Sequence, residues 1–275
     1  MDAPSDIDWV DCIRDHAVAA AGSIGKLGGH VSLVIGASGD LGAAAALGLA
    51  AAGSDIIVAS RRFERCEGVA EAARNLGVRA KAIQVDATSQ NELDVLFAEV
   101  EAEHGRLDVL VNCLGVNIRK PAQAITPQDW EAVFDVNLKA VFFACRAAFP
   151  LMRKVGKGRI INVASAAGLV ARAWPPTSIY GTSKAGLVHL TRYLAAEWAD
   201  KGITVNAIAP GYFRTTLTQP LWSHPGKLRR ALRLTPLGRL GEIEEFVGPV
   251  IFLASHASSF ITGHTLSVDG GRAIV

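Results

Sequence analysis

Val31-Ser32-Leu33-Val34-Ile35 runs directly into Gly36-Ala37-Ser38-Gly39-Asp40-Leu41-Gly42, and an alanine-rich segment follows. The first five residues are apolar and β-rich, which predicts a buried strand, and the alanines after the turn predict a helix. Glycines between a strand and a helix let backbone amides approach a pyrophosphate, and the amino terminus of the helix favours its negative charge. The stretch therefore predicts the opening unit of a dinucleotide-binding fold.

Asp40 is the unusual residue of this turn. A carboxylate that points at a pyrophosphate repels it, whereas at the start of a helix the same side chain can cap free amides and point away from the ligand. We therefore expect Asp40 to cap the helix.

Six more β-rich runs follow along the chain, separated by segments of helical composition. They cover residues 56–59, 80–85, 109–111, 159–163, 204–208 and 265–268. Apolar strands that alternate with helices predict a parallel sheet with helices on both faces, and right-handed crossovers favour a doubly wound α/β fold of the Rossmann type. No linker, low-complexity tract or internal repeat interrupts the pattern, so we expect one domain over residues 28–275 with a seven-stranded sheet.

Residues 1–27 form an extension before the first strand. An acidic start is wrong for signal and transit peptides, which begin basic, and the aspartates here are Asp2, Asp6, Asp8, Asp11 and Asp15. We expect a frayed or loosely docked helical arm, and a neighbouring subunit is one surface on which such an arm could pack.

The composition excludes several classes of protein. Half of the 275 residues are hydrophobic, and no stretch approaches the roughly 20 apolar residues of a membrane span. The net charge of +2 gives no reason to expect nucleic acid or an anionic membrane as a partner. The four cysteines have no paired spacing, which argues against disulfides and a metal site and suits a reducing, cytoplasmic compartment.

The end of the second strand indicates which cofactor is bound. Dinucleotide folds that choose NAD usually place an acid there for the ribose hydroxyls, but this chain has Ser60-Arg61-Arg62. Two guanidinium groups without an acid favour a 2′-phosphate, so we expect NADP(H) to be preferred over NAD(H). The other reading of these residues is a solvated basic turn.

Polar residues and glycines follow the ends of most predicted strands. Because the carboxyl ends of parallel strands meet at one edge of a sheet, these residues can converge on one site. They are Gly36, Ser60, Asp86, Asn112, Ser165 and Pro210.

Tyr180 and Lys184 lie four residues apart in a predicted helix over 179–200, fifteen residues after Ser165. That spacing puts both side chains on one helical face. A positive charge beside a phenol lowers its pKa from about 10, and the tuned tyrosine can exchange a proton with a substrate oxygen. Taken alone, the pair is better explained as part of an exposed helix face.

The complete ordered set resembles the short-chain dehydrogenase/reductase family over nearly everything after residue 28. The matching elements are the glycine turn, Asp86-Ala87, Asn112-Cys113-Leu114-Gly115, Asp135-Val136-Asn137-Leu138, Ser165, Tyr180 and Lys184.

The resemblance implies a role for each of these residues. Tyr180 would be the general acid and base, Ser165 would hold the substrate oxygen, and Lys184 would bind the nicotinamide ribose and lower the pKa of Tyr180. Asn137 would anchor a water relay. The adenosine half would lie against Asp86, Ala87 and the segment from Asn112 to Gly115, and the nicotinamide amide against Pro210-Gly211 and Thr215. The family is mostly dimeric or tetrameric, which implies a homo-oligomer.

Three features depart from the family pattern. Asp40 occupies the slot of the middle glycine in the turn, and Ile35 stands where a threonine is usual. Cys113-Leu114 follows Asn112 where a small residue is usual. The interval from Ser165 to Tyr180 is longer and contains Trp174-Pro175-Pro176, which we expect to shape the substrate pocket.

The implied activity is the interconversion of a ketone and a secondary alcohol with NADP(H). From 212 to 241 there is no acid, and the basic residues are Arg214, Lys227, Arg229, Arg230, Arg233 and Arg239. In the family this region is a lid over the substrate, so an anionic carbonyl compound is indicated, although a solvated helix face explains the bias as well. Asn117-Ile118-Arg119-Lys120 resembles the gluconate 5-dehydrogenase-like branch, which implies a keto-sugar acid. The alternatives are a 3-oxoacyl-thioester reductase and, in another class, a non-catalytic NADP(H) sensor.

Overall fold

The structure, a computed structural model, describes residues 10–15 and 25–275. Its centre is a parallel sheet in the order β3-β2-β1-β4-β5-β6-β7. All seven expected strands are confirmed, with bounds that differ from the sequence analysis by at most two residues. They are β1 Val31–Ile35, β2 Asp55–Ser60, β3 Ala80–Gln84, β4 Val109–Asn112, β5 Gly158–Val163, β6 Ile203–Pro210 and β7 Thr265–Val268.

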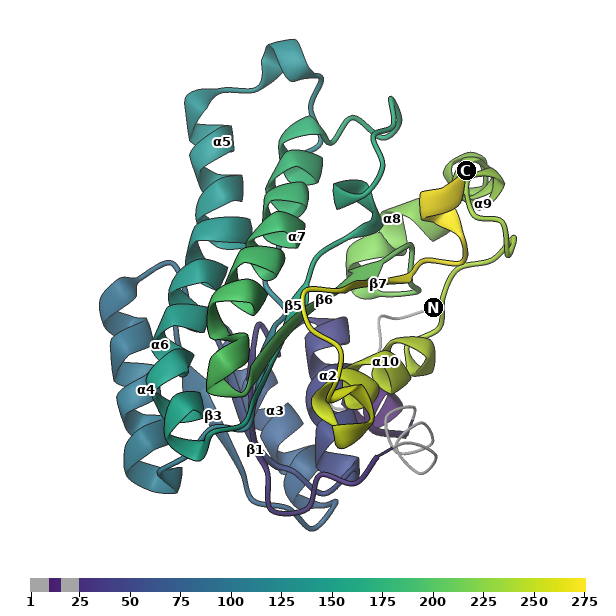
Figure 1. Cartoon of the computed structure of the whole chain (residues 1–275). Coiled ribbons are helices and arrows are strands. Elements are labelled where there is room, and N and C mark those ends of the chain that lie inside the picture. The colour runs from purple at the N-terminus through teal and green to yellow at the C-terminus, as the bar shows by residue number, and fades with distance from the viewer. Residues whose placement is uncertain (1–9, 16–24) are drawn as a thin grey trace.

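Helices cover both faces of the sheet, as Figure 1 shows. One layer contains α2 (Asp40–Ala51), α3 (Phe63–Arg74) and α10 (Glu244–Ala254). The other contains α4 (Gln90–His104), α6 (Ala140–Val155) and α7 (Ser178–Trp198), with α5 (Pro127–Phe134) leading into α6. The short helices α8 (Gln219–Trp222) and α9 (Pro225–Arg233) follow β6.

Alternate residues of each strand supply two separate cores. Val34 of β1 and Val111 of β4 belong to the core under α2 and α10, whereas Leu33 and Leu110 belong to the core under α4, α6 and α7. This is the period of two expected for strands that are buried on both faces. The apolar runs of the sequence are continuous for that reason.

The strand order reverses between β1 and β4, because β1 pairs with β2 on one side and β4 on the other. Ligands of doubly wound sheets bind beyond the carboxyl ends of the strands at such a point. The glycine turn after β1 and residues 113–116 after β4 meet there.

The described part of the N-terminal extension docks on the domain. Residues 10–15 are helical, and Val10 and Ile13 are buried in the same core as Cys66 and Ala70 of α3. The rest of the expected arm, apart from residues 25–27, lies outside the described residues.

No helix in the described ranges is both long and apolar enough to cross a membrane. No group of three metal-ligating side chains is present there either.

Candidate active site

The glycine turn after β1 is held by close backbone contacts. Gly36 has φ +89°, and a Cβ there would lie 2.3 Å from the Cys113 carbonyl oxygen. A Cβ at Gly42 would lie 2.4 Å from the carbonyl oxygen of Gly36. Both positions therefore need glycine. Gly39 is the N-cap residue of α2, and a Cβ there would meet only the Gly36 carbonyl oxygen, at an ordinary 3.7 Å. Chain packing alone does not explain that glycine, which leaves open space in front of the first amides of α2 and fits a pyrophosphate.

Asp40 is the first residue of α2, after the N-cap residue Gly39. Its buried carboxylate accepts hydrogen bonds from the backbone amide and from the hydroxyl of Thr216, the latter at 3.3 Å. These bonds tie the glycine turn to the segment that follows β6, a role beyond the capping of α2, which stays a prediction.

The basic end of β2 folds back over the turn. Arg62 Nη2 donates to the Ser38 carbonyl oxygen at 2.9 Å and to Ser38 Oγ at 3.1 Å, and Arg65 Nη1 donates to the same carbonyl at 3.3 Å. Burial lowers the pKa of Arg62, and the neighbouring charge of Arg65 acts in the same direction. Two cations are thus gathered beside a serine hydroxyl, which fits a phosphate on the adenosine ribose. Ser60 accepts from the Arg62 amide at 3.2 Å, and Arg61 is exposed.

The predicted adenosine contacts divide into two groups. Asp86 is hydrogen-bonded to the hydroxyl and amide of Thr88, which lowers its pKa, and Ala87 is buried in the core under α4. The Asn112 side chain is turned into the protein, where Nδ2 donates to Asn162 Oδ1 at 2.9 Å. A contact between Asn112 and the cofactor could therefore come only from its backbone.

Ser165 and Tyr180 are brought together by two elements. Ser165 follows β5 and is the N-cap residue of the 3₁₀ turn η3 (Ala166–Gly168). Its Oγ accepts a hydrogen bond from the Ala167 amide at 3.1 Å. Tyr180 lies in the first turn of α7. Burial raises the pKa of Tyr180, while a hydrogen bond with the Ser165 side chain and the charge of Arg119 act against that rise.

Lys184 is held by two backbone carbonyls. Its ammonium is buried and donates to the carbonyl oxygens of Leu114 and Val163 at 2.8 and 2.7 Å. Desolvation lowers the pKa of Lys184 to about 8. We expected Lys184 to lower the pKa of Tyr180. The net shift of the Tyr180 pKa is upward instead, because burial of the phenol outweighs the opposing effects and the Lys184 ammonium is directed at backbone carbonyls.

Asn137 occupies an irregular turn between α5 and α6. Residues Asp135–Lys139 form the π-helical segment η2, and such bulges are frequent at functional sites. Asn137 Oδ1 accepts from the Val116 amide at 2.8 Å, while Nδ2 donates to the Val116 carbonyl and to Ser183 Oγ, both at 3.0 Å. A Cβ at Gly115 would lie 3.6 Å from Lys184 Nζ and 3.9 Å from Asn137 Oδ1. The segment after β4, Asn137 and Lys184 therefore form one contiguous group.

The end of β6 completes the edge of the site. Pro210 pairs with Val268, and a Cβ at Gly211 would lie 2.7 Å from the Asp269 backbone. Thr215 is nearly buried, and its carbonyl accepts from the Trp222 indole at 3.4 Å. These contacts fix the segment after β6 at the carboxyl edge of the sheet.

Some of the basic side chains in the lid, residues 212–241, already have acidic partners within the protein. Arg214 contacts Glu242 at 3.3 Å and Arg239 contacts Glu245 at 2.6 Å, so acids just past the acid-free stretch compensate two of the six charges. The Arg230 guanidinium lies 4.6 Å from the ring centroid of Trp174. The long Ser165 to Tyr180 loop and α9 are therefore in contact.

Sequence reasoning missed three parts of the site. Arg65 was detectable, since it lies three residues after Arg62 at the start of a helix. Thr216 gave no signal, because its partner Asp40 is 176 residues away. The packing of η3 on α7 was also missed: a Cβ at Gly168 would lie 2.7 Å from the Lys184 carbonyl carbon, and a Cβ at Gly181 would lie 2.9 Å from the Ala167 oxygen.

The sheet is doubly wound, and a glycine turn lies where its strand order reverses. A serine, a tyrosine and a lysine lie beside that turn. This combination defines a nicotinamide-dependent oxidoreductase. Residues 36–273 match the family model described as Enoyl-(Acyl carrier protein) reductase. The chain belongs to the short-chain dehydrogenase/reductase family, whose members act on CH–OH groups with NAD(P).

Individual relatives cover nearly the whole chain. The gluconate 5-dehydrogenase of Gluconobacter oxydans is 34% identical over 90% of this chain and 96% of its own. The 3-oxoacyl-[acyl-carrier-protein] reductase of Synechocystis is 39% identical over 89% of this chain and 97% of its own. A gluconate 5-dehydrogenase from Burkholderia cenocepacia, solved in complex with NADP and tartrate, superposes with a TM-score of 0.87 at 36% identity, covering 94% of this chain and 100% of the other.

Proposed function

We propose that this protein is an NADP(H)-dependent enzyme that interconverts a keto-sugar acid, or a similar small anionic ketone, with its secondary alcohol. The observation that carries the proposal is the close approach of the Ser165 side chain to the Tyr180 phenol, beside the buried Lys184, at the sheet edge that also holds the glycine turn. A hydroxyl and a phenol at one point can bind and protonate one carbonyl oxygen.

Residues of this chain supply the proton that the proposed ketone reduction needs. When bound, the nicotinamide supplies or accepts the hydride. Because burial raises the pKa of Tyr180, its phenol stays protonated near neutrality and can donate to the oxygen that forms in ketone reduction. Ser165 donates a second hydrogen bond to that oxygen. In this proposal Lys184 binds the nicotinamide ribose, and Asn137 holds the segment after β4 beside it.

The Tyr180→Phe variant tests the proton donor. Phenylalanine keeps the ring but lacks the hydroxyl, so the variant should fold and bind NADPH with wild-type affinity. Its turnover should fall at least about a hundredfold, the usual scale for a general acid. Stopped-flow or steady-state oxidation of NADPH measures the effect, and near-normal turnover would exclude Tyr180 from this role.

NADP(H) preference rests on Arg62 and Arg65 above Ser38. The affinity for NADPH should exceed that for NADH in a fluorescence titration, and Arg62→Gln should weaken NADPH binding by about tenfold or more while leaving NADH nearly unchanged. Arg74→Gln is the control. Arg74 lies at the far end of α3 and pairs with Glu67, so its loss should not change the affinity for NADPH. Equal or better NADH affinity in the wild type would refute the preference.

The substrate class is supported by the relatives that are named gluconate 5-dehydrogenases and by the basic residues around the site. The runner-up, a 3-oxoacyl thioester, is supported by the relatives named 3-oxoacyl-[acyl-carrier-protein] reductase, such as that of Synechocystis. An absorbance assay at the NADPH band separates them. Keto-sugar acids should be reduced with a higher kcat/KM than acetoacetyl thioesters, and the opposite order would favour the runner-up.

A further inference from the structure

Arg272 is buried but only partly hydrogen-bonded. It lies in the 3₁₀ turn η7 (Arg272–Ile274) just after β7, and 7% of its surface is exposed. Nη2 donates to the Tyr212 hydroxyl at 3.3 Å, and the guanidinium carbon lies 4.2 Å from the Tyr212 ring centroid. Nη1 is buried and has no acceptor among the described residues. A buried charged donor without an acceptor is costly, so it indicates a place for an acceptor from outside the chain.

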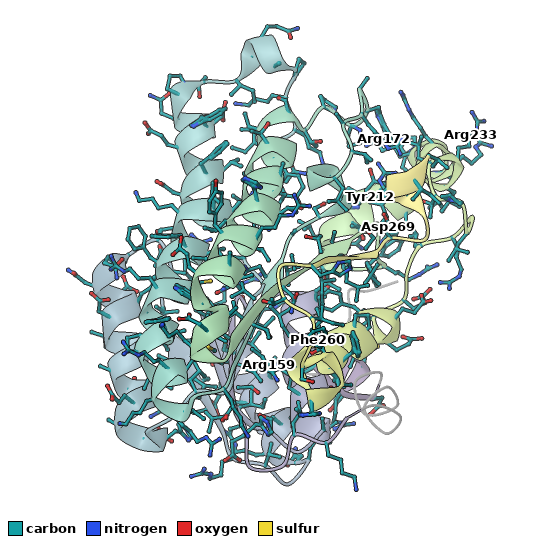
Figure 2. The ribbon with its side chains drawn as sticks, viewed as in Figure 1. Arg159, Arg172, Tyr212, Arg233, Phe260 and Asp269 are labelled. Carbon is teal, nitrogen blue, oxygen red and sulfur yellow. The ribbon has the colours of Figure 1, made fainter. Side chains whose placement is uncertain are left out.

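Arg172 brings a second guanidinium to the same place. It comes from the long loop between Ser165 and Tyr180, and its Nη2 donates to the carbonyl oxygen of Arg272 at 2.7 Å and to that of Val275. Its Nε is also buried without an acceptor among the described residues. Figure 2 shows Arg172 and Tyr212 at the end of the molecule that holds α9 and the C-terminal turn, whereas Arg159 lies toward the opposite end of the sheet.

The charges at this place are not balanced. Burial lowers the pKa of Arg272 and the charge of Arg172 acts in the same direction, while Tyr212 and Asp269 oppose the shift. Asp269 is the nearby acid, and its two oxygens already accept from the amides of Gly271 and Ala273 at 2.9 and 2.8 Å. The nearby side-chain carboxylate is thus already engaged by the backbone, and a further anion would be stabilised between the two guanidinium groups.

The turn η7, which carries Arg272, packs against an element of the active site. The turn η7 contacts η3, which begins directly after Ser165. Tyr212, on which Arg272 stacks, is one of the groups whose charge acts on Tyr180. A small substrate that spans this contact would reach both the guanidinium pair and the Ser165 and Tyr180 hydroxyls.

We propose that Arg272, together with Arg172, binds the carboxylate of the substrate while Ser165 and Tyr180 hold its carbonyl oxygen. The proposal rests on the proposed function and makes it more specific, since it names the two residues that select an acid over a neutral sugar. A planar guanidinium matches a carboxylate with two parallel hydrogen bonds. Arg214 and Arg239 of the lid contribute less because each already has a glutamate partner.

The first test needs only the wild-type enzyme. A six-carbon keto-sugar acid and its primary amide differ in charge but hardly in shape. We expect kcat/KM with NADPH to be at least about tenfold higher for the acid, the lower end for hydrogen bonds to a charged group. Turnover of both at equal efficiency overturns the carboxylate subsite alone. No turnover of either compound, with turnover of another ketone, overturns the proposed substrate class and the subsite with it.

The second test assigns the preference to residues. Arg272→Met should lower kcat/KM for the acid about ten- to a hundredfold, mainly through KM, and change it little for the amide. Arg172→Met should act in the same direction, and NADPH affinity should stay at the wild-type value in both. Arg153→Met, an exposed arginine in the last turn of α6, is the control that should keep the wild-type ratio.

The outcomes separate recognition from support of the fold. An equal fall for acid and amide means that Arg272 only braces Tyr212, and the proposal is wrong. Arg272→Lys, which keeps the charge, covers the case in which Arg272→Met does not fold. It should retain part of the preference for the acid, and full loss of activity on both compounds with intact folding counts against the proposal.

Discussion

At the scale of single residues, Lys184 is the buried group with the most direct consequence. Its ammonium is surrounded by protein and donates to two backbone carbonyls, and the pKa of Lys184 falls from 10.5 to about 8 because burial disfavours the charge. Folding therefore releases a proton from this residue between those two values.

The release predicts how stability depends on pH. Between pH 8 and 10.5 the unfolded chain binds more protons than the folded one, so the free energy of unfolding should rise with pH in this window. Below pH 8 the desolvation cost is present in full. Relative to Lys184→Met, the wild type should gain up to about 3 kcal/mol between pH 8 and 10.5. Urea unfolding of both proteins across this range measures it, and a flat or falling difference contradicts the buried charge.

Asp40 gives a second prediction at this scale. If its role is to hold Thr216, Asp40→Ala should cost about 1 to 3 kcal/mol, since it leaves the Thr216 amide without its acceptor. Asp40→Asn keeps an acceptor oxygen and should cost less. Amide exchange at Thr216 should accelerate in the alanine variant. Unchanged exchange there, with fraying of the first turn of α2, would favour capping as the main role of Asp40.

At the scale of elements, the strands were predictable and the site contacts only partly so. Apolar runs such as 31–35 can form little else when helical segments alternate with them, and the structure has that strand at the expected residues. The direction of Asn112 and the partner of Asp40 depend on which surfaces meet in the folded chain. Local sequence does not encode those surfaces, so the side-chain network around Asn162 and Thr191 could not be foreseen.

The contact between η3 and α7 makes a prediction about element packing. Gly181→Ala should improve helix propensity by up to about 1 kcal/mol, yet its Cβ would lie 2.9 Å from the backbone oxygen of Ala167. We expect net destabilisation and lower turnover, because η3 must move and Ser165 moves with it.

Gly186→Ala in the same helix is the matched control. Its Cβ would meet the flexible Leu138 side chain at 3.1 Å, which can give way. Thermal unfolding and kcat of the two variants should therefore diverge. Equal effects would show that the close approach of η3 to α7 does not set the position of Ser165.

At the scale of the whole molecule, the two cores and the site depend on a single sheet. The glycine turn, the guanidinium cluster of Arg62 and Arg65, and the Ser165 and Tyr180 pair all lie beyond its carboxyl edge, while α6 and α7 cover one face (Figure 1). Function is therefore confined to one edge, and the outer surfaces of the helices are available for other contacts.

Those outer surfaces carry the last prediction, that the protein is a homo-oligomer. Tyr193 on α7 is 60% exposed and Phe142 on α6 is 37% exposed, and apolar aromatic surface of this kind is enriched where proteins associate. Analytical ultracentrifugation should give a dimer or tetramer. Tyr193→Glu, which puts a charge on that helical face, should shift the distribution toward smaller species while NADPH binding persists in the separated subunits. Asp94→Lys on α4 is a charge-changing control on an exposed helix, and a wild-type monomer at micromolar concentration would refute the prediction.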